Sequence, residues 1–116
     1  MTNNNYEQKC LELDKSLAEA FGWVDTIESY SGYSGKQTGW SGILGKSELK
    51  SIPRWTQDDG ECFKLMVDHK CFPQLEDSWH SVMCCGGYYY LGEYDTEQSA
   101  VRFAICSAVL AKLTNK

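Results

Sequence analysis

Two β-rich runs that lead directly into a long apolar helix are the feature that most constrains the fold of this chain. Residues 79–85 and 88–94 are rich in residues that favour β-strands, and Gly86-Gly87 separates the two runs. Adjacent glycines supply the positive φ angles of a tight hairpin turn. We therefore predict a hairpin over residues 79–94 in which Cys84 faces Tyr89. Both faces of this hairpin are largely apolar, which predicts that both are covered.

The run after the hairpin predicts a buried helix near residues 96–113. Asp95 or Thr96 would cap its first turn, and Gln98 follows at the spacing of a capping box. Its apolar residues occupy more than one face: they are Val101, Phe103, Ala104, Ile105, Ala108, Val109, Leu110 and Leu113. A helix of this kind is expected to be the most buried one.

Two further helices are predicted before the hairpin. The first covers residues near 5–21, because apolar residues recur at spacings of three and four, and Gly22 would end it in a left-handed conformation. Its apolar positions are Tyr6, Cys10, Leu13, Leu17 and Phe21. The second covers residues near 57–69, with Thr56 as its cap and Asp58 and Asp59 in its first turn. Its apolar stripe is Cys62, Phe63, Met66 and Val67.

Between these two helices the composition changes. Residues 29–47 consist mainly of Ser, Gly, Tyr, Trp, Lys and Thr, with little periodicity. This stretch is predicted to be a long loop or an irregular strand pair. With 116 residues, of which 42% are hydrophobic, the chain is expected to form one domain over residues 1–116, with residues 29–47 as an insert. The fold class is α+β, a layered α/β/α sandwich whose small antiparallel sheet is covered by the three helices.

Charge and cysteine usage limit the partners and the compartment. The net charge of −5 argues against general binding of duplex nucleic acid or of an anionic membrane, since either needs a basic face. Residues 1–8 lack the pattern of a secretion signal, and no apolar run has the length of a membrane span. A cytoplasmic protein is expected. Its six cysteines are then reduced, with Cys10, Cys62 and Cys106 as small buried hydrophobes.

Three short motifs resemble the phage ABA sandwich family of small phage and prophage proteins. The stretch Leu13-Asp14-x-x-Leu17-Ala18-Glu19-x-x-Gly22-Trp23 is similar to the opening of that family. Pro53-x-Trp55-Thr56-x-Asp58 is similar to the entry to its second helix, and Ala104-Ile105-Cys106-x-Ala108-x-Leu110 to its closing helix. The resemblance implies a helix, sheet, helix layering and a phage or prophage origin, and it implies no catalytic residues. Residues 29–47 are not part of the family pattern.

The insert and the segment after it carry the candidate ligand-binding residues. Aromatic rings among small polar residues are typical of recognition loops, and glycine N–H groups with lysines can bind phosphate. The candidates are Tyr33, Lys36, Trp40, Lys46, Arg54 and Trp55. For Tyr33 and Trp40, binding and packing are equally compatible with the sequence.

Known catalytic and metal-binding patterns fit this chain poorly. Gly45-Lys46-Ser47 ends like a nucleotide-binding P-loop, but the first glycine of that motif would fall at Trp40. The chain has no Cys-x-x-Cys pair, so neither a metal nor another cofactor is expected. A small enzyme that uses Cys71, His69 or His80 remains an alternative without support from the spacing.

The sequence therefore favours a non-enzymatic phage or prophage accessory protein that binds a host factor or a small nucleotide-like ligand. A counter-defence sponge that sequesters a nucleotide immune signal in the host cytoplasm is one form of this hypothesis, because stacking rings and Lys or Arg are what such a ligand needs. The alternative from another class is a structural or protein-interaction module that forms a homo-oligomer or docks on a host protein.

Overall fold

The structure is a computed structural model that describes residues 2–33, 35–76, 81–84, 87–90 and 97–114. Within these residues it contains three helices, α1 (Thr2–Ala20), α2 (Asp59–His69) and α3 (Glu97–Thr114). The first antiparallel sheet consists of β1 (Trp23–Tyr30), β2 (Gln37–Leu44) and β3 (Lys50–Ser51), and the second of β4 (Gln74–Glu76), β5 (Ser81–Cys84) and β6 (Gly87–Tyr90). The α+β class predicted from the sequence is confirmed.

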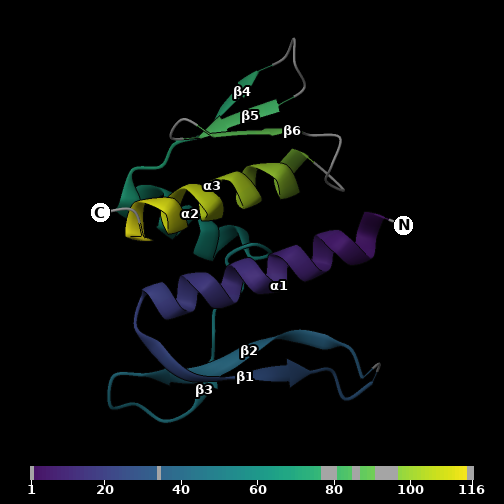
Figure 1. The fold of residues 1–116 in the computed structure, drawn as a ribbon, viewed down its shortest axis with the longest axis vertical. Coiled ribbons are helices and arrows are strands. Elements are labelled where there is room, and N and C mark those ends of the chain that lie inside the picture. The colour runs from purple at the N-terminus through teal and green to yellow at the C-terminus, as the bar shows by residue number, and fades with distance from the viewer. Residues whose placement is uncertain (1, 34, 77–80, 85–86, 91–96, 115–116) are drawn as a thin grey trace.

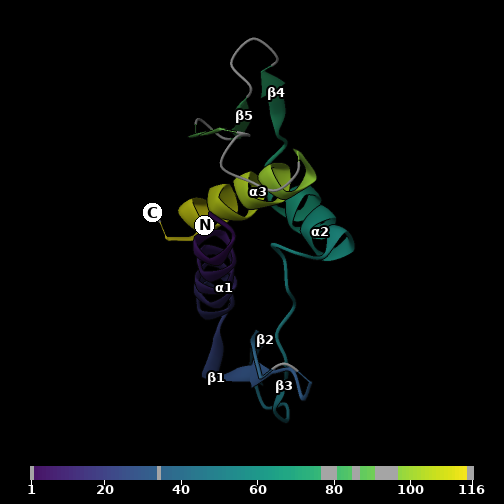
Figure 2. The same cartoon turned by 90° about the vertical axis from the view of Figure 1, so that its right-hand side faces the viewer.

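The helices lie between the two sheets (Figures 1 and 2). Helix α3 packs against β5 and β6 on one side and against α1 and α2 on the other. Helix α1 in turn packs against β1 and β2. The layers therefore run sheet, helices, sheet. The sheet of β1, β2 and β3 was not part of the expected layering, and it arises because the chain after α1 folds back onto that helix as strands.

Helix α3 supplies much of the core. Its buried residues include Ala100, Ala104, Cys106, Ala108 and Val109, so small side chains dominate its contacts. Small residues let neighbouring elements approach closely, which explains how one helix can contact α1, α2 and the hairpin together. The prediction of a deeply buried last helix is confirmed. Its predicted cap, Asp95 or Thr96, lies outside the described residues.

Helix α1 ends as its sequence predicts. Gly22 adopts a φ of +100°, the left-handed conformation that glycine accepts without steric cost. Of the predicted apolar positions, Cys10, Leu13 and Leu17 are buried, and Phe21 is half-buried. Burial extends further, to the residues Leu11, Asp14 and Ala18. Because α1 lies between a sheet and α3, more than one of its faces is covered.

Helix α2 begins differently from the prediction. Its N-cap is Asp58, whose Oδ1 accepts a hydrogen bond from the backbone N–H of Glu61 at 2.9 Å, so the helix starts at Asp59 and not at residue 57. Thr56 is not the cap, because its hydroxyl and its N–H both donate to Asp14. The predicted apolar stripe is also partly wrong, since Phe63 and Val67 are exposed while Leu65 is buried.

The hairpin near the C-terminal helix is confirmed with a different register. Cys84 pairs with Gly87 and Val82 with Tyr89, so Gly87 belongs to the strand ladder and not to the turn. The predicted pairing is therefore shifted by two residues, because Gly87 belongs to a strand. Because side chains along a strand alternate between the two faces of the sheet, a register shift of two residues leaves each side chain on its predicted face. Residues 79, 80 and 91–94 of the predicted hairpin lie outside the described residues.

Most of the insert forms a strand pair, one of the two predicted forms. Strand β1 pairs with β2 from Trp23 opposite Leu44 to Tyr30 opposite Gln37, with irregularities near both ends. The pairing begins at Trp23, well before residue 29. Trp23 is buried, and this burial holds the start of β1 in place. A Cβ atom at Gly42 would lie within 3.3 Å of Trp23, Ile52 and the backbone of Val24, so only glycine lets these groups approach.

Candidate functional site

A buried carboxylate holds the segment between β3 and α2 against α1. Asp14, in the middle of α1, is 0% exposed. Its Oδ1 accepts from the N–H of Thr56 at 3.0 Å, and its Oδ2 accepts from Thr56 Oγ1 at 2.8 Å and from Arg54 Nε at 2.7 Å. A buried charge costs free energy unless it is paired and hydrogen-bonded, and both of these carboxylate oxygens are bonded. Asp14 therefore fixes where Arg54 can lie.

Arg54 is held on three sides. Besides the ion pair with Asp14, its Nη1 donates to the carbonyl of Thr38 on β2. A Cβ atom at Gly39 would lie 2.9 Å from Arg54 Cδ, so the side chain runs directly over the backbone of β2. Among the described residues, no acceptor is assigned to Nη2. Since the side chain is 26% exposed, this amino group can donate to a ligand from a pre-organised position.

A polar cleft of about 330 Å³ opens at this point. It lies where the N-terminal half of α1, the β1–β2 turn and the segment before α2 meet. Its lining residues are Glu7, Leu11, Ser31, Lys36, Gln37, Thr38, Arg54 and Gln57. The cleft thus combines two cations, hydroxyl and amide groups and one carboxylate, and its volume is in the range of small-molecule sites.

The β1–β2 turn that carries Lys36 is held by its own backbone. The N–H of Ser31 donates to the carbonyl of Lys36 at 2.9 Å, and the N–H of Gly35 donates to the carbonyl of Ser31 at 3.0 Å. Gly35 has a φ of +69°, which allows the chain to reverse here. Tyr33 lies on the same turn with its side chain fully exposed. The turn therefore presents one ring and one cation next to the cleft.

The two predicted tryptophans are packed more deeply. Trp40 is half-buried, its Nε1 donates to the carbonyl of Leu11 at 2.8 Å, and Lys15 Nζ lies 5.0 Å from its ring centroid. Trp55 is buried in the core, where its ring contacts Phe21 at a centroid distance of 5.5 Å. Neither residue lines the polar cleft. Trp40 therefore attaches β2 to α1, and Trp55 contacts the residue that directly follows α1.

Lys46 lies apart from the other candidates. It is exposed in the turn that follows β2, beside the pair of Trp23 and Leu44, whereas Lys36 lies beyond the opposite end of the same ladder. With a rise of about 3.4 Å per residue along eight-residue strands, the two turns are about 25 Å apart. The structure thus brings Lys36 and Arg54 together with the Tyr33 turn, and it separates Lys46 from them.

Burial shifts the titration of Asp14. The loss of solvent raises the pKa of this carboxyl above its ordinary value of 3.8, and the hydrogen bonds from Arg54 and Thr56 limit the rise. Asp14 was not among the candidate residues predicted from the sequence. A signal existed, because Asp14 is four residues after Cys10 and four before Ala18, on the buried face of a helix where a charge needs a partner.

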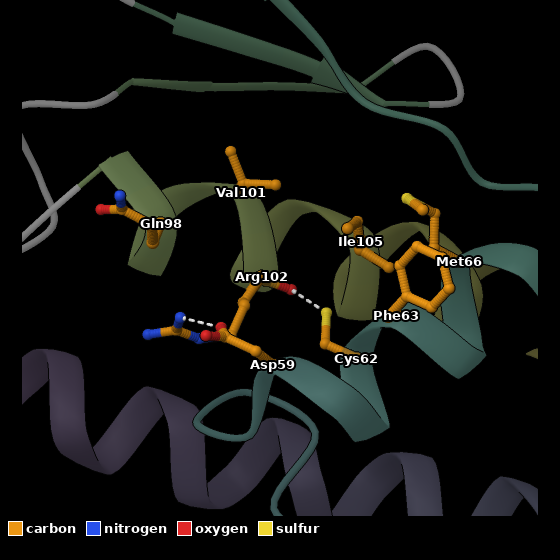
Figure 3. A pocket seen from close by; sticks show the side chains of 8 residues that line it. All are labelled: Asp59, Cys62, Phe63, Met66, Gln98, Val101, Arg102 and Ile105. Carbon is orange, nitrogen blue, oxygen red and sulfur yellow. Dashed lines mark hydrogen bonds and ion pairs between the residues drawn. The ribbon is translucent and has the colours of Figure 1, made fainter.

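A second cavity, of about 340 Å³, lies between α2 and α3 (Figure 3). Phe63 and Met66 from α2 and Val101 and Ile105 from α3 give it mainly apolar walls, with Cys62 between the helices. Its remaining lining residues are Asp59, Gln98 and Arg102. Arg102 forms an ion pair with Asp59 at 2.6 Å, and its Nε donates to the carbonyl of Thr56 at 2.9 Å. We call this cavity the α2–α3 groove.

Cysteines and histidines show no metal-binding arrangement in the part of the chain that the structure describes. No group of three His, Cys, Asp or Glu side chains there is placed to hold a metal ion. Cys10, Cys62, Cys71, Cys84 and Cys106 are all buried. His69 lies beside Phe21, with ring centroids 5.6 Å apart, and His80 lies outside the described residues.

Comparisons with protein-family models, with curated protein sequences and with solved structures give no match. The resemblance to the phage ABA sandwich family therefore stays a prediction. Among the described residues, no helix is long and apolar enough to cross a membrane.

Proposed function

We propose that this protein is a non-enzymatic binding protein whose polar cleft takes a small nucleotide-like ligand. The observation that supports this most is the meeting of Lys36 and Arg54 on one cleft of about 330 Å³. A phosphate would accept hydrogen bonds from Arg54 Nη2 and lie within reach of the Lys36 ammonium. Tyr33, exposed on the same turn, is available to stack on a base.

The cleft favours a particular kind of nucleotide. Glu7 adds a carboxylate to the lining, so a long polyphosphate would be repelled there. The same carboxylate can accept hydrogen bonds from the amino groups of a base. We therefore favour a ligand with one phosphate per base, such as a cyclic nucleotide. Sequestration of a nucleotide immune signal by a phage accessory protein is the biological role that we propose for such binding.

Calorimetric titration of the purified protein with a panel of cyclic and linear nucleotides tests this proposal. Lys36→Ala and Lys46→Ala are matched variants, because both lysines are exposed in turns of the same hairpin and only Lys36 lines the cleft. Loss of one charged hydrogen bond should weaken binding about tenfold in Lys36→Ala, and Lys46→Ala should bind like the wild type. No heat with any nucleotide, or equal losses in both variants, would refute the proposal.

A second candidate function is self-association through α2. Phe63 is 60% exposed and Val67, one turn later, is 46% exposed, so the two lie on one face beside the apolar α2–α3 groove. A projecting ring next to an apolar groove is self-complementary, which a twofold interface between identical chains requires. We propose a second copy of this chain as the occupant.

Sedimentation velocity over a concentration series tests self-association. Phe63→Lys should abolish any dimer, whereas Leu49→Lys, at a residue of similar exposure that directly precedes β3, should not. A monomer at every concentration, or a dimer that survives Phe63→Lys, would remove this candidate.

A further inference from the structure

Two buried thiols meet where α2 and α3 pack together. Cys62 lies on α2 and Cys106 on α3, and the two side chains are close enough that each shifts the pKa of the other. The S–H of Cys62 also donates to the carbonyl of Arg102 at 3.8 Å (Figure 3). Because the two sulfurs are neighbours on different helices, a bond between them would join α2 to α3 covalently.

The surroundings make the two thiols unequal. The hydrogen bond from Cys106 lowers the pKa of Cys62, burial acts in the opposite direction, and the nearby Arg102 guanidinium lowers it further against the charges of Asp59 and Asp14. The same hydrogen bond and burial raise the pKa of Cys106 well above its ordinary value. Cys62 is therefore the thiol that ionises first, and the thiolate is the nucleophilic form of cysteine.

Only one of the two thiols lines an opening. Cys62 contributes to the wall of the α2–α3 groove, although it is just 2% exposed, whereas Cys106 is fully buried and does not line it. The groove, of about 340 Å³, is open to solvent and mainly apolar, so a small uncharged oxidant can enter. An oxidant that arrives by this route meets the more acidic sulfur first.

We infer that Cys62 and Cys106 form a peroxide-sensitive redox pair, in which Cys62 is the attacking thiol and Cys106 the resolving one. The Cys62 thiolate attacks one oxygen of a peroxide, the O–O bond breaks, and the departing oxygen leaves as water after it takes up a proton. Cys106 then attacks the sulfenic sulfur of Cys62, the S–O bond breaks, and the second oxygen also leaves as water. Two thiols are oxidised to one disulfide while one hydrogen peroxide is reduced to two waters.

This inference does not depend on the proposed ligand, because the polar cleft and the α2–α3 groove share no lining residue. Its consequence is mechanical. The disulfide would fix α2 against α3 and would place a covalent bond beneath the groove that Phe63 borders. Reduction by a cellular thiol would restore the open pair.

The chain contains its own control. Cys71 and Cys84 are as deeply buried as the redox pair and are also near each other, since Cys84 Sγ lies 3.6 Å from the carbonyl oxygen of Cys71. Neither lines the α2–α3 groove. If burial and proximity alone decided oxidation, this second pair would react as readily as the first.

The test is peptide mapping of the native protein after graded treatment with hydrogen peroxide and alkylation of the remaining thiols. We expect a Cys62–Cys106 bridge to form while Cys71 and Cys84 are still recovered in alkylated form, because only Cys62 lines the groove by which the oxidant enters. Cys106→Ser should leave a Cys62 sulfenic acid that dimedone traps, Cys62→Ser should leave Cys106 reduced, and Cys84→Ser should still form the bridge.

Several outcomes would overturn the inference. These are no bridge in the wild type, a bridge between Cys10 and Cys106, and oxidation of Cys71 and Cys84 at the same rate as Cys62. The mapping of the wild type is sufficient for each of them, so the test does not depend on whether a serine variant folds. Where one does not, the alanine variant at the same position replaces it.

Discussion

Replacement of Asp14 by Asn removes the interaction that connects α1 to the polar cleft. In Asp14→Asn the amide oxygen can keep the hydrogen bond from the N–H of Thr56, and the amide NH₂ takes the place of Oδ2. That group is a donor, so it would face the Nε–H of Arg54, which now points at Oδ2 from 2.7 Å. Thr56 Oγ1 can rotate to accept, but Arg54 cannot.

The expected cost follows from this one lost contact. A hydrogen bond between charged groups is worth about 1.5–3 kcal/mol, and a buried donor left without a partner costs about 1–3 kcal/mol more. Because Arg54 is partly exposed and water can replace some of the bond, we expect about 3 kcal/mol in total. For a chain of 116 residues this corresponds to a fall in Tm of about 12 °C.

Urea denaturation at neutral pH, followed by tryptophan fluorescence, measures this loss. Asp58→Asn is the matched control, since it is the same substitution at an exposed N-cap where Asn caps as well as Asp. The double variant with Arg54→Met should cost less than the two single variants combined, because both remove one interaction. If Asp14→Asn destabilises no more than Asp58→Asn, the buried ion pair does not hold this part of the fold.

The remaining predictions concern the same network. Folding raises the pKa of Asp14, so the pH-dependent part of its contribution to stability is fully present below the unfolded value near 3.8 and is lost as pH rises through the native value, while the hydrogen bonds of the carboxylate remain. The stability advantage of the wild type over Asp14→Asn should therefore shrink from acidic to neutral pH in urea titrations. An advantage that grows with pH would contradict the raised pKa of Asp14. Gly39→Ala should cost about 1–3 kcal/mol by thermal unfolding, because its methyl group would displace Arg54, and Gly32→Ala, with open space around it, should be near neutral. Trp40→Phe should cost about 1 kcal/mol through the lost bond to the Leu11 carbonyl, and an unchanged urea midpoint would count against that bond.

Local pattern was sufficient for the main elements. The apolar spacing around Leu13 and Leu17 predicts α1, and Gly22 marks its end at the correct residue. The long apolar run in 97–114 likewise predicts a deeply buried helix. These features depend on neighbours within a few residues, so the amino-acid sequence alone determines them.

Details that depend on distant partners could not be read from local pattern. Thr56 has the chemistry of a helix cap, yet its hydroxyl bonds Asp14, more than forty residues earlier in the chain, and Asp58 caps α2 instead. Gly86-Gly87 looks like a complete turn, but Gly87 is used as a strand partner of Cys84. In each case the local pattern allows two solutions, and tertiary contacts select one of them.

The same division holds for the candidate sites. The sequence by itself determined that cations and rings gather in and after residues 29–47. Only the tertiary structure decided that Lys36 meets Arg54 on one cleft while Lys46 lies at the far end of the hairpin, and that Trp55 is buried. It also brought Cys62 and Cys106 together from separate helices. The physical reason is that a strand pairing or a helix packing places residues by register and crossing, quantities that no short stretch of sequence contains.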